Sequence, residues 1–261
     1  MLLALDIGNT NIKVGLFKAG VLFSSWRMMS DKFLTADEYG IKMESFFSHI
    51  NIPKNMVSGI AISSVIPSMN YTIEHMCNLY FNGRTPMFVS NDLTIGLENK
   101  YDYPDTVGTD RLCNAAAVYK LYGGPSVAVD FGTATNFAVV SGAGEFLGGV
   151  ICPGFRVSAD ALTESTAMLP KVQFIKPDKI ICTNTEQAIQ AGIVYGYVGQ
   201  VEYIIHKIKN ELGEVPKVVA TGGMSSLIAS ESDSIDLINP TLTLEGLNII
   251  YEINKSKIKS K

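Results

Sequence analysis

Two segments of this sequence repeat one arrangement of residues that could do chemistry. An apolar run near the start ends in Asp6-Ile7-Gly8-Asn9-Thr10, and a second run in the middle ends in Asp130-Phe131-Gly132-Thr133. Each copy combines a carboxylate, a glycine turn with free backbone N–H groups, and short hydroxyl or amide side chains. Such a set can hold nucleotide phosphates and a cation together. The repeat, spaced by nearly half of the 261 residues, predicts two similar domains that face one nucleotide.

Either motif alone is weak evidence, because Gly and Asn tolerate positive φ and both motifs would also suit an ordinary hairpin turn. A third small-residue turn, Ala220-Thr221-Gly222-Gly223-Met224, follows a predicted strand and precedes a predicted helix. Its glycines leave room for a flat or phosphorylated ligand, and a helix N-terminus favours anions. The alternative is a tight turn with no ligand. Beside the paired motifs, we interpret it as a contact to adenosine.

A further candidate site begins at Tyr101 and ends in Gly108-Thr109-Asp110-Arg111, where a helix is expected to start. Arg111 is suited to a substrate carboxylate through bidentate hydrogen bonds. Asp110 could accept the proton of a substrate hydroxyl as it attacks phosphorus. The alternative makes Asp110 an N-terminal helix cap and Arg111 a surface charge.

The elements that must position these residues alternate between strands and helices, which predicts an α/β fold. Within the helix over 35–49, apolar spacing indicates core positions at Tyr39, Ile41, Met43, Phe46 and Phe47. Gly123-Gly124-Pro125 ends a helix and marks the expected boundary between domains 1–122 and 123–261. Strands are expected over 2–5, 12–17, 21–27, 59–65, 86–89, 126–130, 136–141 and 217–221, and the other helices over 71–81, 110–122, 158–168, 185–212, from 224 and over 243–254.

The helix over 185–212 carries a stripe of small residues, Ala188, Gly192, Gly196 and Gly199. Glycine costs about 1 kcal/mol in a helix interior, so three of them require a compensating close contact. That contact is either packing within the subunit or the interface of a homodimer.

Composition narrows the class of protein. The formal net charge is −4, which argues against nucleic acid as a partner, and we interpret the basic end Lys255–Lys261 as a solvated tail. The four cysteines are scattered, which fits a reducing cytoplasm and neither a disulfide nor a zinc framework. No long apolar run indicates a membrane span.

In this order the motifs resemble those of the type III pantothenate kinases, over residues 2 to about 254. The resemblance is carried by Asp6 to Lys13, Tyr101 before Gly-Thr-Asp-Arg, Asp-Phe-Gly-Thr-Ala-Thr from Asp130, Gly148 to Gly154, Thr185 before the small-residue helix, and Thr-Gly-Gly from Thr221. It implies two ribonuclease-H-like (actin-like ATPase) domains with ATP bound in the cleft between them. It also implies transfer of the ATP γ-phosphoryl group to the primary hydroxyl of pantothenate, the first step of coenzyme A biosynthesis.

The resemblance also implies roles for individual residues. Asp110 would be the catalytic proton acceptor, and Asp6 would lie near Mg²⁺ through water. Asp130 would bind a monovalent cation, potassium or ammonium. ATP would be held by Asp6, Ile7, Gly8, Asn9, Thr10, Asn11, Ile12, Lys13, Thr133, Gly222 and Gly223, and pantothenate by Tyr101, Gly108, Thr109, Asp110, Arg111 and, from a partner subunit, Thr185.

One segment departs from the family pattern. Many relatives have Thr and Asp where this chain has Asn136 and Ala138, so the cation requirement or affinity is expected to differ. Two alternatives stay open. One is another small-molecule kinase of the same superfamily, and the other is a non-enzymatic accessory regulator of transcription with the same fold.

Overall fold

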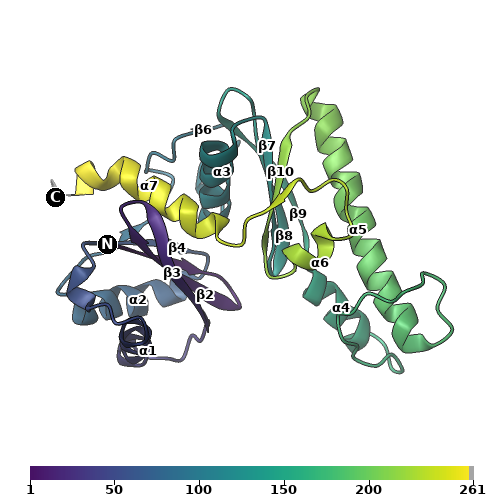
Figure 1. The fold of residues 1–261 in the computed structure, drawn as a ribbon, viewed down its shortest axis with the longest axis horizontal. Coiled ribbons are helices and arrows are strands. Elements are labelled where there is room, and N and C mark those ends of the chain that lie inside the picture. Colours follow the sequence, from purple (N-terminus) through teal and green to yellow (C-terminus); the bar gives the residue numbers. More distant parts are fainter. Residues whose placement is uncertain (259–261) are drawn as a thin grey trace. The chain divides into compact units, whose positions relative to one another are not determined.

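A computed structural model describes residues 1–258 of the chain, which divide into two compact units (Figure 1). The first unit contains Met1–Ala117 and the chain from Thr241 onward, and the second contains Val118–Pro240. The predicted domains 1–122 and 123–261 are therefore corrected in two respects. The boundary lies inside the helix α3 (Thr109–Tyr122), and the terminal helix α7 (Leu242–Ile258) belongs with the first unit. Residues 259–261 of the basic tail lie outside the described residues.

The first unit is built on a sheet in the order β3-β2-β1-β4-β5. β1 (Leu2–Ile7), β2 (Asn11–Lys18) and β3 (Val21–Met29) are antiparallel neighbours, and β4 (Gly59–Ser64) and β5 (Met87–Phe88) add in parallel. The expected hairpin and third strand are confirmed. The unit also contains β6 (Glu98–Asn99) and two short 3-10 helices, Lys54–Met56 and Pro104–Thr106.

Helices cover the two faces of this sheet differently (Figure 1). α1 (Ala36–His49) and α2 (Pro67–Tyr80) pack on the face that bears the large side chains of the core, among them Leu5, Val14 and Ile62. α7 packs along β1, β2 and β4 on the other face. That face carries Gly15, whose missing side chain leaves room for Leu244, and Gly59, whose missing side chain leaves room for the ring of Tyr251. Small residues thus let the terminal helix approach the strands closely.

The helical spacing of apolar residues explains most of the buried side chains of α1. Thr35 caps this helix through a capping box with Glu38. Tyr39, Met43 and Phe47 are buried and Phe46 is partly buried, as predicted, but Ile41 is 61% exposed, so its assignment to the core is wrong. Ile41 lies about 200° around the helix from Tyr39, on the solvent side.

The second unit repeats the first in its strand order, β9-β8-β7-β10-β11. β7 (Ser126–Phe131), β8 (Ala134–Val140) and β9 (Glu145–Pro153) are antiparallel neighbours, and β10 (Lys217–Gly222) and β11 (Leu237–Ile238) add in parallel. Each unit therefore has three antiparallel strands followed by two parallel ones. The predicted α/β fold with two similar domains is confirmed.

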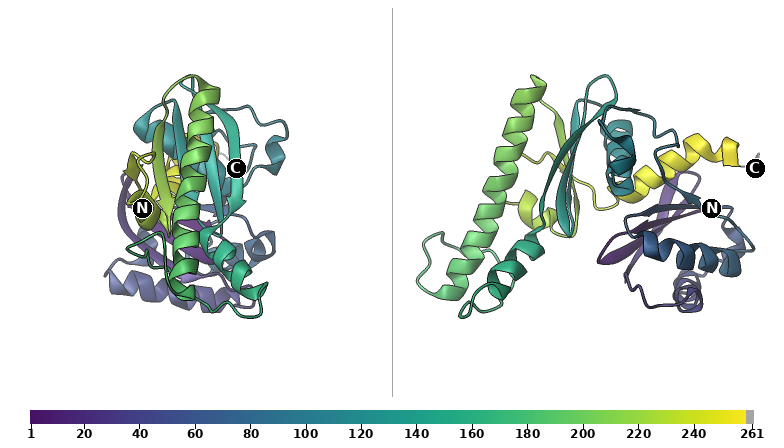
Figure 2. Two further views of the ribbon diagram at one scale, coloured as in Figure 1. Left: turned by 90° about the vertical axis from the view of Figure 1, so that its right-hand side faces the viewer. Right: turned by 180° about the vertical axis from the view of Figure 1, so that it is seen from behind.

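The long helix α5 (Thr185–Leu212) packs on the β7–β8–β10 face, and Figure 2 shows it running across this sheet. Val194, Tyr197 and Val201 are among its buried contacts with Val129 and Phe137. α4 (Phe155–Glu164) and α6 (Ser225–Ala229) complete the unit. The predicted bounds of α5 are confirmed, whereas α4 begins and ends a few residues earlier than predicted.

The small-residue stripe of α5 lies on its other side. A β-carbon placed at Gly192, Gly196 or Gly199 would meet no atom within 4 Å. Packing within this chain therefore gives no reason for these glycines. No helix in the described part of the chain is both long and apolar enough to span a bilayer.

The two kinds of helical glycine lead to opposite stability predictions. A β-carbon at Gly246 of α7 would overlap the backbone carbonyl of Cys113 in α3. We expect Gly246→Ala to lower the free energy of unfolding by about 1–3 kcal/mol, the usual cost of overpacking. Gly199→Ala, in open space, should raise it by up to about 1 kcal/mol, because alanine favours the helix. Urea unfolding followed by circular dichroism measures both. Equal shifts in the two variants would show that α7 does not pack this closely on α3.

Candidate active site

The first Asp-x-Gly turn lies where β1 ends and β2 begins. The amide of Gly8 donates to the carbonyl of Asn11 (3.1 Å), which closes the turn. Ser30 fixes it from β3's end, because its hydroxyl donates to the Gly8 carbonyl (2.6 Å) and its amide to the Thr10 carbonyl (3.1 Å). Asn9 and Thr10 are exposed, so an anion has access to the turn. Ile7 and Ile12 are buried in the core, which leaves only their backbone for a ligand.

Asp6 stands at the centre of a row of polar side chains across the sheet. In register it faces Lys13 of β2 on one side and Ser63 of β4 on the other. The Lys13 ammonium lies 3.5 Å from the Asp6 carboxylate, and Asp6 is only 6% exposed. This pair offers a positive group for phosphate and a negative group for a hydrated divalent ion in one place.

Thr109 ties the start of α3 to the end of β4. Its hydroxyl lies 3.0 Å from the Ser63 hydroxyl, accepts from the Ser64 amide (3.1 Å) and donates to the Ser64 carbonyl (3.2 Å). Since Ser63 is the register partner of Asp6, this contact brings Asp110 to the same end of the sheet as Asp6.

Asp110 lies in the first turn of α3, as the sequence predicts. Its carboxylate accepts from the backbone N–H of Arg111 (2.9 Å). A β-carbon at Gly108 would lie 2.6 Å from the Asp110 carboxylate, so the glycine leaves room for this rotamer. Asp110 therefore bonds a helix-terminal amide, but that of the next residue, whereas an N-cap bonds an amide two or three residues on. This bond does not exclude a proton-accepting role, because a carboxylate has further lone pairs.

The pKa of the Cys113 thiol is affected by the charges of both acids. Cys113 is buried, and burial together with the negative charges of Asp6 and Asp110 raises its pKa well above the usual value.

Arg111 is buried, with 4% of its surface exposed, so the alternative of a surface charge is wrong. One guanidinium nitrogen donates to the Tyr101 hydroxyl (3.5 Å), and the guanidinium carbon lies 5.5 Å from the centre of the Tyr101 ring. The structure therefore brings together Tyr101 and Arg111, which the sequence places ten residues apart. A buried guanidinium held by an aromatic ring is suited to a carboxylate ligand.

In the second unit, Asp130 occupies the position that Asp6 has in the first. Its register partners are Asn136 of β8 and Thr221 of β10, and it is 8% exposed. Gly222 has a φ of +90°, and a β-carbon there would lie 2.6 Å from the Asp130 carboxylate. Gly223 has open space around it. Gly222 therefore leaves the Asp130 carboxylate beside backbone and not beside a side chain.

The departure from the family pattern lies beside Asp130. Asn136 is half-buried, and Ala138, two residues along the same face of β8, is buried. In residues 1–258 no group of three or more His, Cys, Asp or Glu side chains could hold a metal ion.

Thr133 and Thr185 lie on different elements of the second unit. Thr133 is exposed in the turn after β7, and its carbonyl accepts from the Gly154 amide (3.1 Å). Thr185 begins α5 and lines a groove of about 620 Å³ between α4 and α5. The same groove is lined by Ala188, Gly192 and Gly196.

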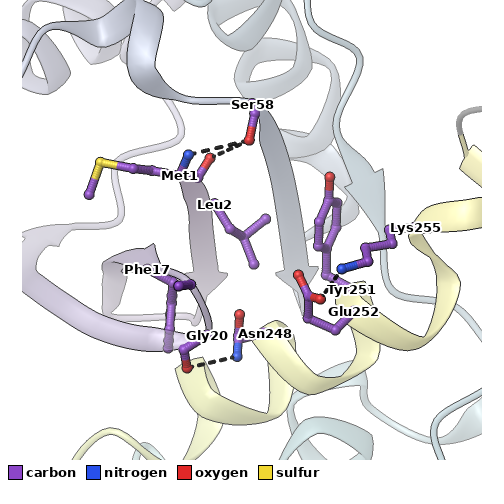
Figure 3. A pocket seen from close by; sticks show the side chains of 10 residues that line it. Met1, Leu2, Phe17, Gly20, Ser58, Asn248, Tyr251, Glu252 and Lys255 are labelled. Carbon is purple, nitrogen blue, oxygen red and sulfur yellow. Dashed lines mark hydrogen bonds and ion pairs between the residues drawn. The ribbon is translucent and has the colours of Figure 1, made fainter.

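A separate cavity of about 280 Å³ lies at the opposite end of β1, away from Asp6 (Figure 3). Leu2 and Phe17 line it from the sheet, and Asn248, Tyr251 and Lys255 line it from α7. None of the predicted site residues lines it.

Two residues that sequence reasoning missed support the first turn, Ser30 and Ser63. Serine is a common residue, so its type alone does not predict a role at a site. Only the register of β4 beside β1, and the return of the chain after β3, give them a place.

Comparison with known proteins places this arrangement in a family. The model of the type III pantothenate kinase family matches residues 2–207. A protein from Campylobacter jejuni assigned to the Baf family of transcriptional activators has a similar structure, with 18% identity, a TM-score of 0.60 and coverage of 97% of this chain and 99% of that one. The activator of 2-hydroxyisocaproyl-CoA dehydratase from Clostridium difficile, solved with bound ADPNP, gives 13% identity, a TM-score of 0.58 and coverage of 100% and 97%.

A ROK hexokinase from Thermus thermophilus is similar over 100% of this chain and 99% of that one, with 14% identity and a TM-score of 0.50. At these identities the structures support the two-domain actin-like fold alone. The family model spans well over half of the sequence and includes both Asp-x-Gly turns and the Asp110 segment. The chain belongs to the type III pantothenate kinase family.

Proposed function

We propose that this protein is a pantothenate kinase that transfers the ATP γ-phosphoryl group to the primary hydroxyl of pantothenate, giving 4'-phosphopantothenate. Membership of the family supports this assignment. The observation that carries it is the bonding of Thr109 to Ser63, since it holds the acid of α3 beside the acid of β1. A phosphoryl transfer site needs both, one to align the attacking hydroxyl and one near the phosphate charge.

In this proposal the substrate lies between Asp110 and Arg111. The Arg111 guanidinium, buried against Tyr101, binds the pantothenate carboxylate through charge-assisted hydrogen bonds. The carboxylate of Asp110 aligns the primary hydroxyl and accepts its proton as the oxygen attacks phosphorus. Gly108 and Thr109 contribute backbone to the same pocket. Thr185 reaches pantothenate from a partner subunit.

The nucleotide would bind through its phosphates and its adenosine at different segments. Asp6 to Lys13 line the phosphates, with the Lys13 ammonium facing them and the Asp6 carboxylate toward the waters of Mg²⁺. Thr133, Gly222 and Gly223 contact the rest of ATP. Asp130 would hold potassium or ammonium, because Gly222 leaves room beside its carboxylate for a singly charged ion.

The first test is a coupled assay of ADP formation with and without pantothenate. We expect Mg²⁺-dependent ATP consumption that requires pantothenate and increases with potassium or ammonium. Asp130→Asn should raise the potassium concentration needed for half-maximal activation, measured without ammonium. This effect should be larger than the loss of rate at saturating potassium. Turnover stimulated by a sugar and not by pantothenate would favour another small-molecule kinase. No turnover with any of these acceptors would favour the regulator.

A pair of variants separates the roles of Asp110 and Arg111. Asp110→Asn keeps the shape and removes the charge and the basicity. We expect kcat to fall by on the order of 10²-fold or more, the usual contribution of a general base, with pantothenate KM changed little. Arg111→Lys keeps the charge but loses the planar fork, so its main effect should be on pantothenate KM, by roughly 10-fold, with kcat changed less.

Steady-state kinetics and thermal unfolding together decide between these roles and the capping alternative. Arg111→Lys is used in place of Arg111→Ala because the side chain is buried and its loss would leave a cavity. If Asp110→Asn kept full turnover and only lowered the melting temperature, Asp110 would be a helix cap and the proposed mechanism would lose its base.

The stripe of α5 leads to a proposal about assembly. Gly192 and Gly196 line the α4–α5 groove, and among the described residues no atom lies within 4 Å of a β-carbon placed at either glycine. We propose that the same stripe of a second copy packs there in a two-fold homodimer, which would also bring Thr185 to the partner's site.

Multi-angle light scattering tests this assembly at micromolar concentration. The wild type should be a dimer, and Gly196→Leu, which overfills the contact, should be mainly monomeric. Glu211→Leu adds the same side chain to an exposed position in the last turn of α5, about 20 Å along the helix, and should leave the dimer intact. A monomeric wild type would contradict both the proposed interface and the proposed position of Thr185 in the partner's site.

A further inference from the structure

A fourth polar residue completes the row that contains Asp6. Arg27 of β3 is the register partner of Lys13, just as Lys13 is the partner of Asp6 and Asp6 of Ser63. Opposed residues on neighbouring strands point to the same face of a sheet. The Lys13–Asp6 ion pair confirms that face for two of them. The irregularity between β2 and β3 lies at Leu16 and Phe17, beyond this row, and does not change the pairing of Arg27.

The neighbouring row on the same face is small and uncharged. It consists of Ala61, Ala4, Gly15 and Ser25, and the helix α7 packs over this part of the sheet. Polar and charged residues begin one row later, beside the turn after β1. The change from small residues to charges marks where helix packing ends and where a ligand can reach the sheet.

The Arg27 guanidinium is directed to solvent. The residue is exposed, and within residues 1–258 its side chain forms no ion pair or hydrogen bond. Strand spacing of about 5 Å puts it one strand beyond Lys13. Its five N–H donors are therefore accessible to an anion that already contacts Lys13.

The second unit supplies an internal comparison. There the equivalent row is Thr221, Asp130, Asn136 and Ile151, in the same strand order. Lys13 and Arg27 of the first unit are thus matched by an amide and an aliphatic side chain. Two copies of one sheet differ by two positive charges, and those charges lie on the copy whose turn is proposed to hold phosphates.

We propose that Arg27 binds the β phosphate, which remains with the nucleotide after transfer, from the edge of the first sheet. This inference rests on the proposed function. Asp110 lies at the Ser63 end of the row, and attack on phosphorus is roughly in line with the leaving oxygen. Along the row from Asp110, the transferred phosphoryl group would therefore lie near Asp6. Lys13 comes next, and Arg27 follows it on the side of the leaving diphosphate.

The test is isothermal titration of the full chain with Mg²⁺ and ATP, ADP or AMP. Arg27→Ala should raise the Kd of ATP and of ADP by about 10-fold or more, the usual effect of losing a hydrogen bond between charged groups, and change that of AMP by less than about 2-fold. Arg27→Lys should fall between, since lysine keeps the charge without the bidentate fork.

Lys18→Ala is the matched control, because it removes one exposed charge from the far end of the same hairpin. An unchanged Kd in Arg27→Ala, an equal loss for AMP, or an equal loss in Lys18→Ala would each overturn the contact and leave Arg27 as a solvating charge on an edge strand. Circular dichroism checks that each variant is folded.

The titration also separates this inference from the proposed function. A wild type that binds ATP, with Arg27→Ala unaffected, overturns only the role of Arg27. A wild type that binds no nucleotide overturns both. Nucleotide binding that depends on Arg27, without turnover of pantothenate, would keep the phosphate contact and reject the substrate.

Discussion

The parallel pairing of β4 with β1 is the constraint on which the candidate active site depends. It puts Ser63 beside Asp6, and Ser63 is the residue that Thr109 contacts from the start of α3. A slip of one residue in this register would turn Ser63 to the α1–α2 face, because successive side chains of a strand point to opposite faces. Asp110 would then have no fixed position relative to Asp6. The site is precise because it inherits its geometry from a sheet ladder and not from a loop.

The same pairing is held in place by packing on both faces. Large aliphatic side chains bind α1 and α2 on one face, whereas small residues on the other admit α7. α7 also meets α3 closely, where Gly246 passes the carbonyl of Cys113. The helix that ends the chain therefore supports both elements that carry the acids, Asp6 on β1 and Asp110 on α3. This explains why α7 belongs to the first unit.

The strand order shared by the two units gives two equivalent strand ends of different charge. Asp6 and Asp130 stand at equivalent positions, but Lys13 and Arg27 flank the first and Asn136 and Ile151 the second. A carboxylate with a cationic neighbour suits a hydrated metal ion beside phosphate. A carboxylate among glycines and an amide suits a single small cation. Both units have the same arrangement of strand ends. The ligand that each end can bind depends on the residues at two positions, Lys13 and Arg27 in the first unit and Asn136 and Ile151 in the second.

Features that depend on local pattern follow from the sequence alone. Residue pattern predicted the strands of both units, apolar spacing predicted α1, and the paired Asp-x-Gly turns predicted two similar domains. Placing Asp110 at the start of α3 also needed only the helix signal. The helix predicted over 71–81 begins earlier, at Pro67, because proline is suited to the first turn of a helix.

Contacts between segments far apart in the chain could be seen only in the folded structure. The boundary predicted at the Gly123–Pro125 turn is wrong because a turn signal reports local chain reversal, whereas a compact unit depends on where α7 packs. Arg111 could have been a surface charge until the fold buried it against Tyr101. Ser63 and Arg27 have no local signature at all. Their positions follow from strand register, which depends on contacts between residues far apart in the chain, and these are not encoded in the spacing of any one segment.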